Sequence, residues 1–170
     1  MRITELFTAQ SIALNEALTD QEQIISRLVE LQATHGNITD KDAYKKALYA
    51  REAEGSTYVD NGITVPHAKT NVVTRPSLAA LRLSSPVQYN AEDDGNTDLL
   101  FAIAAPENGS LHVDMLARMM QMLMNEDFVE KLKAAKTPAE FLDCIDAQEE
   151  VQFGAESFTQ QEIPQSGYRI

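Results

Sequence analysis

Six consecutive apolar residues near the middle of the chain, Leu99 to Ala104, restrict its fold more than any other feature. Their apolar character does not alternate, as it would in a strand with one face in water. Such a run is typical of a β-strand that is covered on both faces. Helical patterns precede and follow this region. The sequence therefore predicts an α/β fold with a single domain, in which a mixed β-sheet is sandwiched between helices in three layers (α/β/α).

Four segments have the periodicity of amphipathic helices, and each has a recognisable start. The first two start at capping sequences and stop at a glycine. The third has one narrow polar stripe, so most of its surface should be buried, and the fourth has a proline in its first turn. The starts are Thr19 to Glu22, Thr39 to Asp42, Ser110 and Thr137, the glycines are Gly36 and Gly55, and the stripe comprises Asp114, Arg118, Gln121 and Asn125.

Strands are expected between the second and third helices. Residues 62–65, 78–83 and 99–104 have the composition of strands, and residues 86–89 are expected to add an edge strand. An acidic turn follows this edge strand. Together with the helices on either side, these strands supply the middle layer of the predicted fold.

The last part of the chain differs in composition from the rest. Residues 148–170 are rich in Gln, Glu and Ser and have no sustained periodicity, which is typical of a linker. We therefore expect a domain of residues 1–147, followed by a linker or C-terminal tail of residues 148–170 that leads to a further domain. The alternative is that the aromatic residues Phe153, Phe158 and Tyr168 fold back on the body of the protein.

The chain is acidic, with a net charge of −12 from 26 acidic and 14 basic residues. A field of this sign repels nucleic-acid backbones and anionic lipid, so neither is expected as a partner. No apolar run approaches the roughly 18 residues that a membrane span needs, and the amino terminus lacks the pattern of a secretory signal. We therefore expect a cytoplasmic protein without membrane insertion. The single cysteine, Cys144, agrees with a reducing compartment.

Three histidines are candidates for chemistry. His35 comes at the end of the first helix, where a structural role beside the last carbonyl groups is expected. His67 follows an expected strand and Pro66, so its ring should be held at a rigid strand end. His112 lies near the start of the third helix, where free amides and the helix dipole favour a nearby phosphate and a neutral ring. The alternative for His67 and His112 is an ordinary loop or surface histidine.

Arg51 stands in the last turn of the second helix. Its guanidinium is permanently charged and has the planar geometry that suits phosphate oxygens. The alternative is a surface ion pair with Glu52 or Glu54. The sequence has no HExxH pattern, paired cysteines, GxxxxGK[ST] loop or GxSxG turn, so a metal site, a nucleotide loop and a serine nucleophile are not expected.

Two stretches of the sequence together resemble a known family. The first contains Arg51-Glu52, Gly55-Ser56-Thr57 and Asn61-Gly62-Ile63-Thr64-Val65-Pro66-His67, and the second contains Leu100 to Glu107, His112 and Leu116-Ala117. Their order and spacing resemble those of enzyme IIA domains of the fructose–mannitol family of the bacterial phosphoenolpyruvate-dependent sugar phosphotransferase system. The resemblance covers roughly residues 3–146.

The resemblance implies a specific function. An enzyme IIA of this family takes a phosphoryl group from a histidine of the phosphocarrier protein HPr and passes it to a cysteine of enzyme IIB, which phosphorylates sugar entering through the membrane component IIC. At the matching positions, His67 would be the phosphoryl acceptor, His112 the second active-site histidine and Arg51 the active-site arginine. No cofactor is implied, and the family hints at a fructose-like sugar. The alternative is a regulatory module of the nitrogen type, which signals its phosphorylation state by binding other proteins.

The sequence departs from the family pattern beside the expected acceptor. Family members commonly have small residues where this chain has Tyr58-Val59-Asp60, and alanine where it has Thr64. A carboxylate of Asp60 that faced the phosphoryl group would weaken acceptance, because like charges repel. Since the acceptor, the second histidine and the arginine are all present, phosphoryl transfer remains the expected function.

Overall fold

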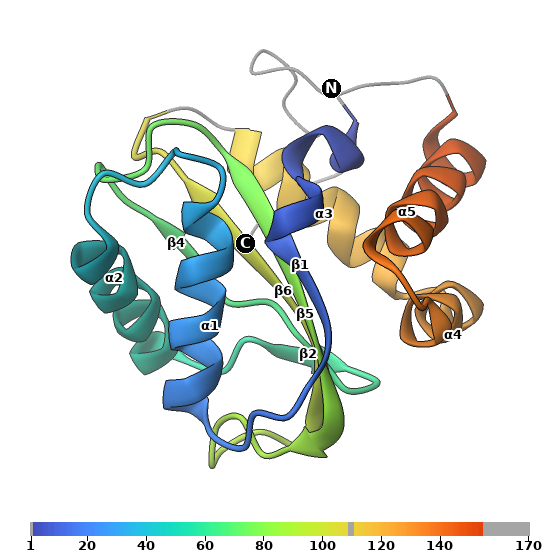
Figure 1. Cartoon of the computed structure of the whole chain (residues 1–170), viewed down its shortest axis with the longest axis horizontal. Coiled ribbons are helices and arrows are strands. Elements are labelled where there is room, and N and C mark those ends of the chain that lie inside the picture. Colours follow the sequence, from blue (N-terminus) through green and yellow to red (C-terminus); the bar gives the residue numbers. More distant parts are fainter. Residues whose placement is uncertain (1, 109–110, 155–170) are drawn as a thin grey trace.

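The structure is a computed structural model that describes residues 2–108 and 111–154, with only the backbone described for Leu111 and His112. Its helices and strands follow the predicted α/β order, with a sheet between two layers of helices (Figure 1). The helices are η1 (Ile3–Leu6), η2 (Ala9–Ser11), α1 (Gln21–Ala33), α2 (Lys41–Glu54), α3 (Leu111–Leu123), α4 (Glu126–Ala134) and α5 (Pro138–Phe153). The strands are β1 (Ile12–Glu16), β2 (Tyr58–Asp60), β3 (Ile63–Thr64), β4 (His67–Lys69), β5 (Ser77–Val87) and β6 (Thr97–Ala105).

Strand β6, which contains the apolar run, is the centre of a mixed sheet in the order β1-β5-β6-β3-β2. It pairs antiparallel with β5 on one edge. On its other edge it pairs in parallel first with β3 and then with β4. The outer strand β1 runs parallel to β5, and β2 pairs antiparallel with β3. The mixed sheet predicted from the sequence is therefore confirmed.

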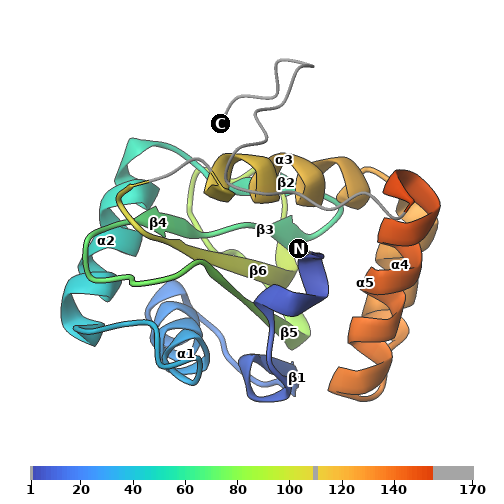
Figure 2. The ribbon, with the colours of Figure 1, turned by 90° about the horizontal axis from the view of Figure 1, so that it is seen from above.

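The side chains of β6 alternate between two hydrophobic cores, one on each face of the sheet. Leu99, Phe101 and Ile103 pack in the core that α3, α4 and α5 cover. The intervening residues, Leu100, Ala102 and Ala104, pack in the core that α1 and α2 cover. Figure 2 shows the two helical layers on opposite sides of the sheet. Because both faces are dry, the strand has no polar face, which explains why its sequence does not alternate.

Helices α1 and α2 are each capped one residue after the predicted start, by Asp20 rather than Thr19 and by Asp40 rather than Thr39. Asp20 is the N-cap of α1, and its carboxylate accepts a hydrogen bond from the backbone N–H of Gln23 at 2.8 Å. Thr19 lies one residue outside, where its N–H donates to the Gln23 side chain. Asp40 caps α2 in the same way through Ala43 N–H at 3.0 Å. Each cap satisfies an amide that the first helical turn leaves without a partner.

One α-helix, α4, was not predicted, and neither were the short 3₁₀ helices η1 and η2. The polar stripe of the third helix was expected to extend to Asn125, but α3 ends at Leu123 and Asn125 is the N-cap of α4, accepting from Phe128 N–H at 2.9 Å. The short helix α4 buries Phe128 and Leu132 under the sheet. An asparagine at the end of one amphipathic pattern and the start of another therefore marks a cap rather than a surface position.

The segment before His67 is a β-hairpin rather than a single strand. Tyr58–Asp60 and Ile63–Thr64 pair antiparallel around a two-residue turn at Asn61 and Gly62. These two residues have φ angles of 54° and 81°, the combination that favours Asn-Gly in hairpin turns. A Cβ at Gly62 would lie 2.6 Å from Oδ1 of Asp98, so the turn has no room for a side chain there. The Asn-Gly pair in the sequence was the signal for strand β2, which was not predicted.

Strand β5 also extends further than predicted. It continues to Val87, which pairs with Thr97, so the first half of the expected edge strand at 86–89 is the end of a strand next to the centre of the sheet, and the second half lies outside the strands. Strand β1 was not predicted either; it is five residues long and only its first residues are buried.

Of the helices in the described part of the chain, none combines the length and apolar character needed to cross a membrane.

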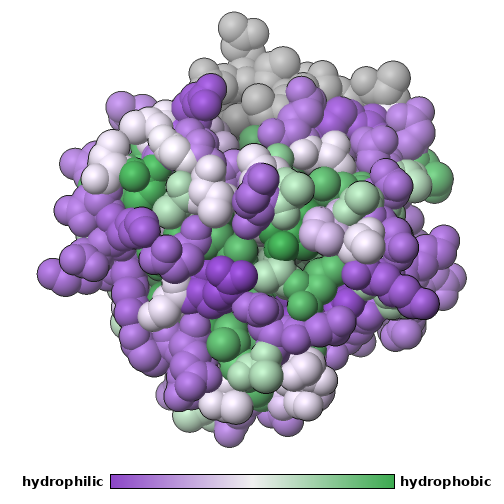
Figure 3. All heavy atoms as spheres, in the orientation of Figure 1, coloured by the Kyte–Doolittle hydropathy of each residue, from purple (hydrophilic) through white to green (hydrophobic). Residues whose placement is uncertain are grey.

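The face of the molecule seen in Figure 1 carries charged and polar side chains over most of its area. Figure 3 shows its apolar side chains as small patches interrupted by hydrophilic ones. Large apolar side chains that stand well out into solvent are Met124 and Val151 among the described residues. Single exposed apolar residues of this kind are ordinary on protein surfaces.

Helix α5 continues past the predicted domain boundary at Ala147 and ends at Phe153. Its Glu149 is fully buried, although it falls in the segment expected to be a linker or tail. Phe153 lies under the guanidinium of Arg118, 4.4 Å from ring centroid to Cζ, so this aromatic residue does fold back on the body. Phe158 and Tyr168 lie outside the described residues, as does most of the predicted tail.

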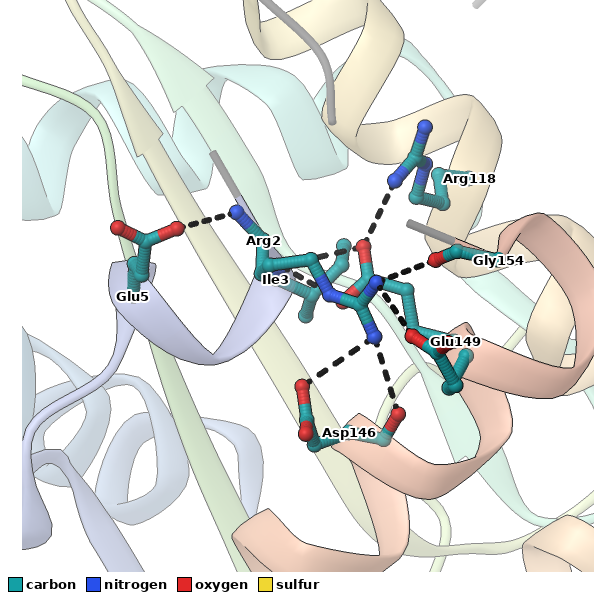
Figure 4. Close-up of polar contacts among 8 residues, drawn as sticks. Arg2, Ile3, Glu5, Arg118, Asp146, Glu149 and Gly154 are labelled. Atoms are coloured by element: carbon teal, nitrogen blue, oxygen red, sulfur yellow. Dashed lines mark hydrogen bonds and ion pairs between the residues drawn. The ribbon is translucent and has the colours of Figure 1, made fainter. Parts of the chain in front are cut away.

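Glu149 is buried because it is the centre of an ion network that joins three distant segments (Figure 4). Its carboxylate accepts from Arg118 of α3 at 2.8 Å and from the backbone N–H of Ile3 at 2.9 Å. The guanidinium of Arg2 lies 3.3 Å from it and also reaches Asp146 and Glu150. The network fixes the start of the chain and helix α3 against helix α5.

Glu149→Gln should lower the free energy of unfolding by about 3 kcal/mol, because it removes the buried carboxylate charge that two arginines and an amide share. Asp146→Asn is the matched control: Asp146 contacts the same Arg2, but its side chain is 57% exposed, and exposed pairs contribute less than about 1 kcal/mol. Urea unfolding of both variants measures the difference. Equal losses in the two variants would contradict the importance of the buried carboxylate.

Candidate functional site

His67 lies on strand β4, which pairs with the central strand β6, and its side chain is beside the end of helix α2. It is the first residue of β4, where it pairs with Ile103 of β6. The strand expected to run directly into it ends earlier, at Thr64, and Val65 and Pro66 form a short link between β3 and β4. The carbonyl of Pro66 accepts from Ile103 N–H at 3.0 Å. The imidazole is therefore held at the start of a strand, rather than at the end of one.

Both ring nitrogens of His67 have partners. Nδ1 lies 2.9 Å from the carbonyl oxygen of Val65, and Nε2 lies 3.2 Å from Nε of Arg51. A carbonyl oxygen can only accept, so Nδ1 carries the ring proton. The guanidinium N–H can only donate, so Nε2 provides a lone pair. The contacts thus select one tautomer and leave Nε2 as the nucleophilic atom.

Arg51 is positioned by the end of helix α2. Its Nη1 donates to the carbonyl oxygen of Gly55, 2.9 Å away, just beyond the last helical turn. This contact turns the Nε edge of the guanidinium towards His67. The expected alternative was an ion pair with Glu52 or Glu54. None of the ion pairs between described residues involves Arg51.

The surroundings of His67 favour the neutral ring. Burial lowers its pKa below the ordinary value of 6.5, and the nearby Arg51 charge lowers the pKa further. The carbonyl of Val65 and the carboxylate of Glu54 act in the opposite direction, but the pKa remains lowered. At neutral pH the lone pair on Nε2 is therefore available.

Two cavities meet at His67 and Arg51. The larger has a volume of about 520 Å³ and is lined also by Glu54 and Lys69. The smaller, of about 120 Å³, lies towards the β-hairpin and is lined by Thr57, Tyr58 and Val59 among others. Leu116 of α3 lines both cavities. His67 thus borders open space that a group attached to its ring could occupy.

His112 belongs to the first turn of α3, four residues before Leu116. Helix α3 reaches the same cavities as His67 through Leu116. The side chain of His112 lies outside the described residues, so its role as a second active-site histidine stays a prediction.

The third histidine, His35, has a structural role that differs from the expected one. Its Nε2 hydrogen-bonds to the carbonyl oxygen of Leu78 on β5, 2.9 Å away, and burial lowers its pKa.

Two of the departures from the family pattern, Asp60 and Thr64, do not reach the cavities, whereas Tyr58 and Val59 line the smaller one. Asp60 is exposed, its carboxylate accepts from Asn61 N–H at 2.9 Å, and it lines neither of the two cavities. Thr64 is buried, and its hydroxyl pairs with that of Thr97 at 2.6 Å. A threonine in this strand is accommodated because its polar atom has a partner.

Sequence reasoning missed Lys69 as a lining residue of the larger cavity. The signal was its spacing: it comes two residues after His67, and such residues lie on the same side of a β-strand. It also missed the polar contacts behind the site, where the hydroxyl groups of Thr57 and Tyr89 both donate to the carboxylate of Glu52. Among the described residues, no group of three or more His, Cys, Asp or Glu side chains could hold a metal ion.

The chain matches a family profile described as "Phosphoenolpyruvate-dependent sugar phosphotransferase system, EIIA 2" over residues 5–148. The fructose-specific EIIABC component of Bacillus subtilis (strain 168) is 36% identical over 146 residues, which are 85% of this chain and 23% of that protein. The fructose-specific EIIA component of Haloferax volcanii is 35% identical over 149 residues, covering 85% of this chain and 97% of that protein. The chain thus spans about a quarter of one relative and nearly all of the other.

Two solved structures share the fold. The nitrogen regulatory protein IIA-Ntr from Neisseria meningitidis superposes with a TM-score of 0.78 at 22% identity, covering 84% of this chain and 98% of that one. The mannitol enzyme IIA from Escherichia coli, solved in complex with phosphorylated enzyme IIB, gives a TM-score of 0.72 at 22% identity, covering 83% and 97%. The family match and the similarity of both fructose-specific relatives lead to one conclusion: this chain belongs to the EIIA 2 family of the phosphoenolpyruvate-dependent sugar phosphotransferase system.

Proposed function

We propose that this chain carries a phosphoryl group on Nε2 of His67, receiving it from phospho-HPr and passing it to enzyme IIB of a sugar phosphotransferase system. The observation that carries this proposal is the state of the imidazole: Nδ1–H is bound to the Val65 carbonyl, and the Nε2 lone pair faces Arg51 and open space. Membership of the EIIA 2 family supports the same function.

The held proton on Nδ1 suits both halves of the transfer. In acceptance, the Nε2 lone pair attacks the phosphorus of the donor phosphohistidine, the P–N bond of the donor breaks, and its electrons return to the donor ring. In delivery, a thiolate of enzyme IIB attacks the phosphorus and the bond to Nε2 breaks. Because Nδ1 has kept its proton, His67 then leaves as a neutral imidazole, which is a better leaving group than an anion.

Arg51 changes partners during this cycle. Its Nε–H contacts the Nε2 lone pair in the free chain, and that lone pair disappears when the P–N bond forms. The guanidinium is then beside the phosphoryl oxygens, to which it can donate instead. A positioned donor of this kind typically stabilises a transition state by roughly 3 kcal/mol. Together with the positive end of the α3 helix dipole and His112, Arg51 would spread the phosphoryl charge.

The partners and the location follow from this role. HPr is the donor, enzyme IIB is the acceptor, and a membrane component IIC would take up the sugar. The fructose-specific relatives favour a fructose-like sugar. A cytoplasmic location is part of the proposal, since HPr works there. The regulatory alternative shares the accepting histidine and differs in having no IIB to supply, so transfer to IIB separates the two.

Intact-mass measurement after incubation with phosphoenolpyruvate, enzyme I and HPr tests the acceptor directly. The wild-type chain should gain one acid-labile phosphoryl group, and His67→Ala should gain none, because the nucleophile is removed. His35→Gln is the control, since it changes a histidine away from the cavities and should leave the gain intact. A phosphoryl group on His67→Ala would show that another residue is the acceptor. Adding enzyme IIB should discharge the wild-type protein; stable retention would favour the regulatory alternative.

The pH dependence of the ring tests the environment of His67. Its pKa should lie below 6.5, so acceptance should persist as the pH falls and be lost only when the pH passes through this lowered pKa. Arg51→Gln should raise the pKa because it removes a neighbouring positive charge, whereas Arg51→Lys should keep it low. Titration of the His67 ring by NMR measures all three values. A pKa that is unaffected by Arg51→Gln would mean that the guanidinium does not act on the ring.

A further inference from the structure

Behind the site, a buried carboxylate holds a polar network that the transfer chemistry does not use. Glu52, in the last turn of α2, is 7% exposed. Its Oε2 accepts from the hydroxyl of Thr57 at 2.8 Å and from the hydroxyl of Tyr89 at 2.9 Å. Glu52 lines neither cavity, so it is not placed to touch a phosphoryl group.

From Thr57 the hydrogen bonds continue to the ring of His67. The carbonyl oxygen of Thr57 accepts from Val65 N–H at 2.9 Å. The carbonyl of the same Val65 accepts from Nδ1–H of His67 at 2.9 Å. The carboxylate of Glu52 is thus connected to the proton-bearing ring nitrogen through two residues, each held by a hydrogen bond of ordinary length.

The other ring nitrogen depends on the same short segment, residues 55–57. Arg51 faces Nε2 of His67 because its Nη1 is held by the carbonyl of Gly55. Ser56, the next residue, donates its hydroxyl to Asp93. Thr57 ends the segment and is fixed by Glu52. Both contacts of the imidazole are therefore set by a segment of three residues whose buried anchor is Glu52.

The electrostatics of Glu52 indicate that it is retained at a cost. Burial raises its pKa, while the hydroxyl groups of Thr57 and Tyr89 and the charge of Arg51 lower it and Asp93 raises it, with a net upward shift. Its second oxygen, Oε1, is buried and has no hydrogen-bond partner among the described residues. A buried polar atom without a partner is unfavourable, so packing alone would favour an apolar residue here.

We propose that Glu52 is a positioning residue for His67, which acts through Thr57 to fix the Nδ1–H tautomer and the orientation of the ring towards Arg51. The inference rests on the proposed function, in which the Nε2 lone pair is the nucleophile. Glu52 itself does not touch the phosphoryl group. Its loss should therefore slow transfer while leaving the binding of phospho-HPr nearly unchanged, because Glu52 is buried and contributes little to the surface that a partner could touch.

Thr57→Val and Thr57→Ser form the matched pair that tests this connection. Valine keeps the shape of threonine and removes the hydroxyl, so the single-turnover rate from phospho-HPr should fall at least tenfold with KM within about twofold, in line with the cost of misplacing a reacting group. Serine keeps the hydroxyl and should restore the rate. Glu52→Gln, which leaves the cavities untouched, should lower the rate in the same direction. Ser11→Ala removes another buried hydroxyl, far from the site, and should have no effect.

The ring itself gives a readout that does not depend on phosphoryl transfer. In the unphosphorylated chain, ¹⁵N NMR of histidine should show Nδ1–H as the dominant tautomer of His67, and its population should fall in Thr57→Val and Glu52→Gln. Unchanged tautomer and rate in both variants would overturn the positioning role. If the wild type accepts no phosphoryl group while the tautomer still responds to the variants, the proposed function fails and the positioning of the ring stands.

Discussion

The central strand β6 is hydrogen-bonded along both edges and covered by helices on both faces, and the position of the site depends on it. Its pairing with β4 sets His67 opposite Ile103, and its pairing with β3 sets the hairpin that precedes His67. One of its faces packs against α1 and α2, and the other against α3 to α5. Helices α2 and α3 lie beside the imidazole, and both pack against the sheet around this strand. The ring is therefore surrounded by rigid elements and not by loops alone.

On this scaffold, the chemistry depends on the two contacts of a single imidazole. The Val65 carbonyl holds the proton on Nδ1, and the guanidinium of Arg51 faces Nε2. Burial and the positive charge of Arg51 both lower the pKa of the ring and keep it neutral, and the same positive charge would stabilise a phosphoryl group on Nε2 under the proposed function. The chain as a whole is strongly acidic, yet the cavity beside His67 contains the basic residues Arg51 and Lys69. The charge near His67 therefore differs in sign from the net charge of the chain.

Local signals in the sequence predicted the parts of the fold that depend on local contacts. The unbroken apolar run indicated a strand covered on both faces, and the Asp and Thr residues at the helix starts indicated α1, α2 and α5. The break between α3 and α4 was missed because Asn125 continues the polar stripe of α3 while acting as the cap of the next helix. Glu149 was assigned to a linker because its neighbours are polar. Its burial results from Arg2 and Arg118, which are far away in the sequence.

The site shows the same limit. His67 and Arg51 were identified because the family pattern marks them, and the structure places their side chains in contact across 16 residues. The connection from Tyr89 through Glu52 and Thr57 could not be predicted, since it joins a loop, a helix end and the segment before β2, and Tyr89 is 37 residues away from Glu52 in the sequence. In the sequence, a buried carboxylate next to an arginine, as in Arg51-Glu52, cannot be told from half of a surface ion pair.

The central claim is that Nε2, and not Nδ1, of His67 receives the phosphoryl group. Long-range ¹H–¹⁵N correlation spectra of the phosphorylated, ¹⁵N-histidine-labelled chain decide this directly, because they distinguish the two ring nitrogens. The account predicts phosphorus on Nε2 with the proton retained on Nδ1. Phosphorus on Nδ1 would contradict it, since that nitrogen would first have to give up both its proton and its bond to Val65.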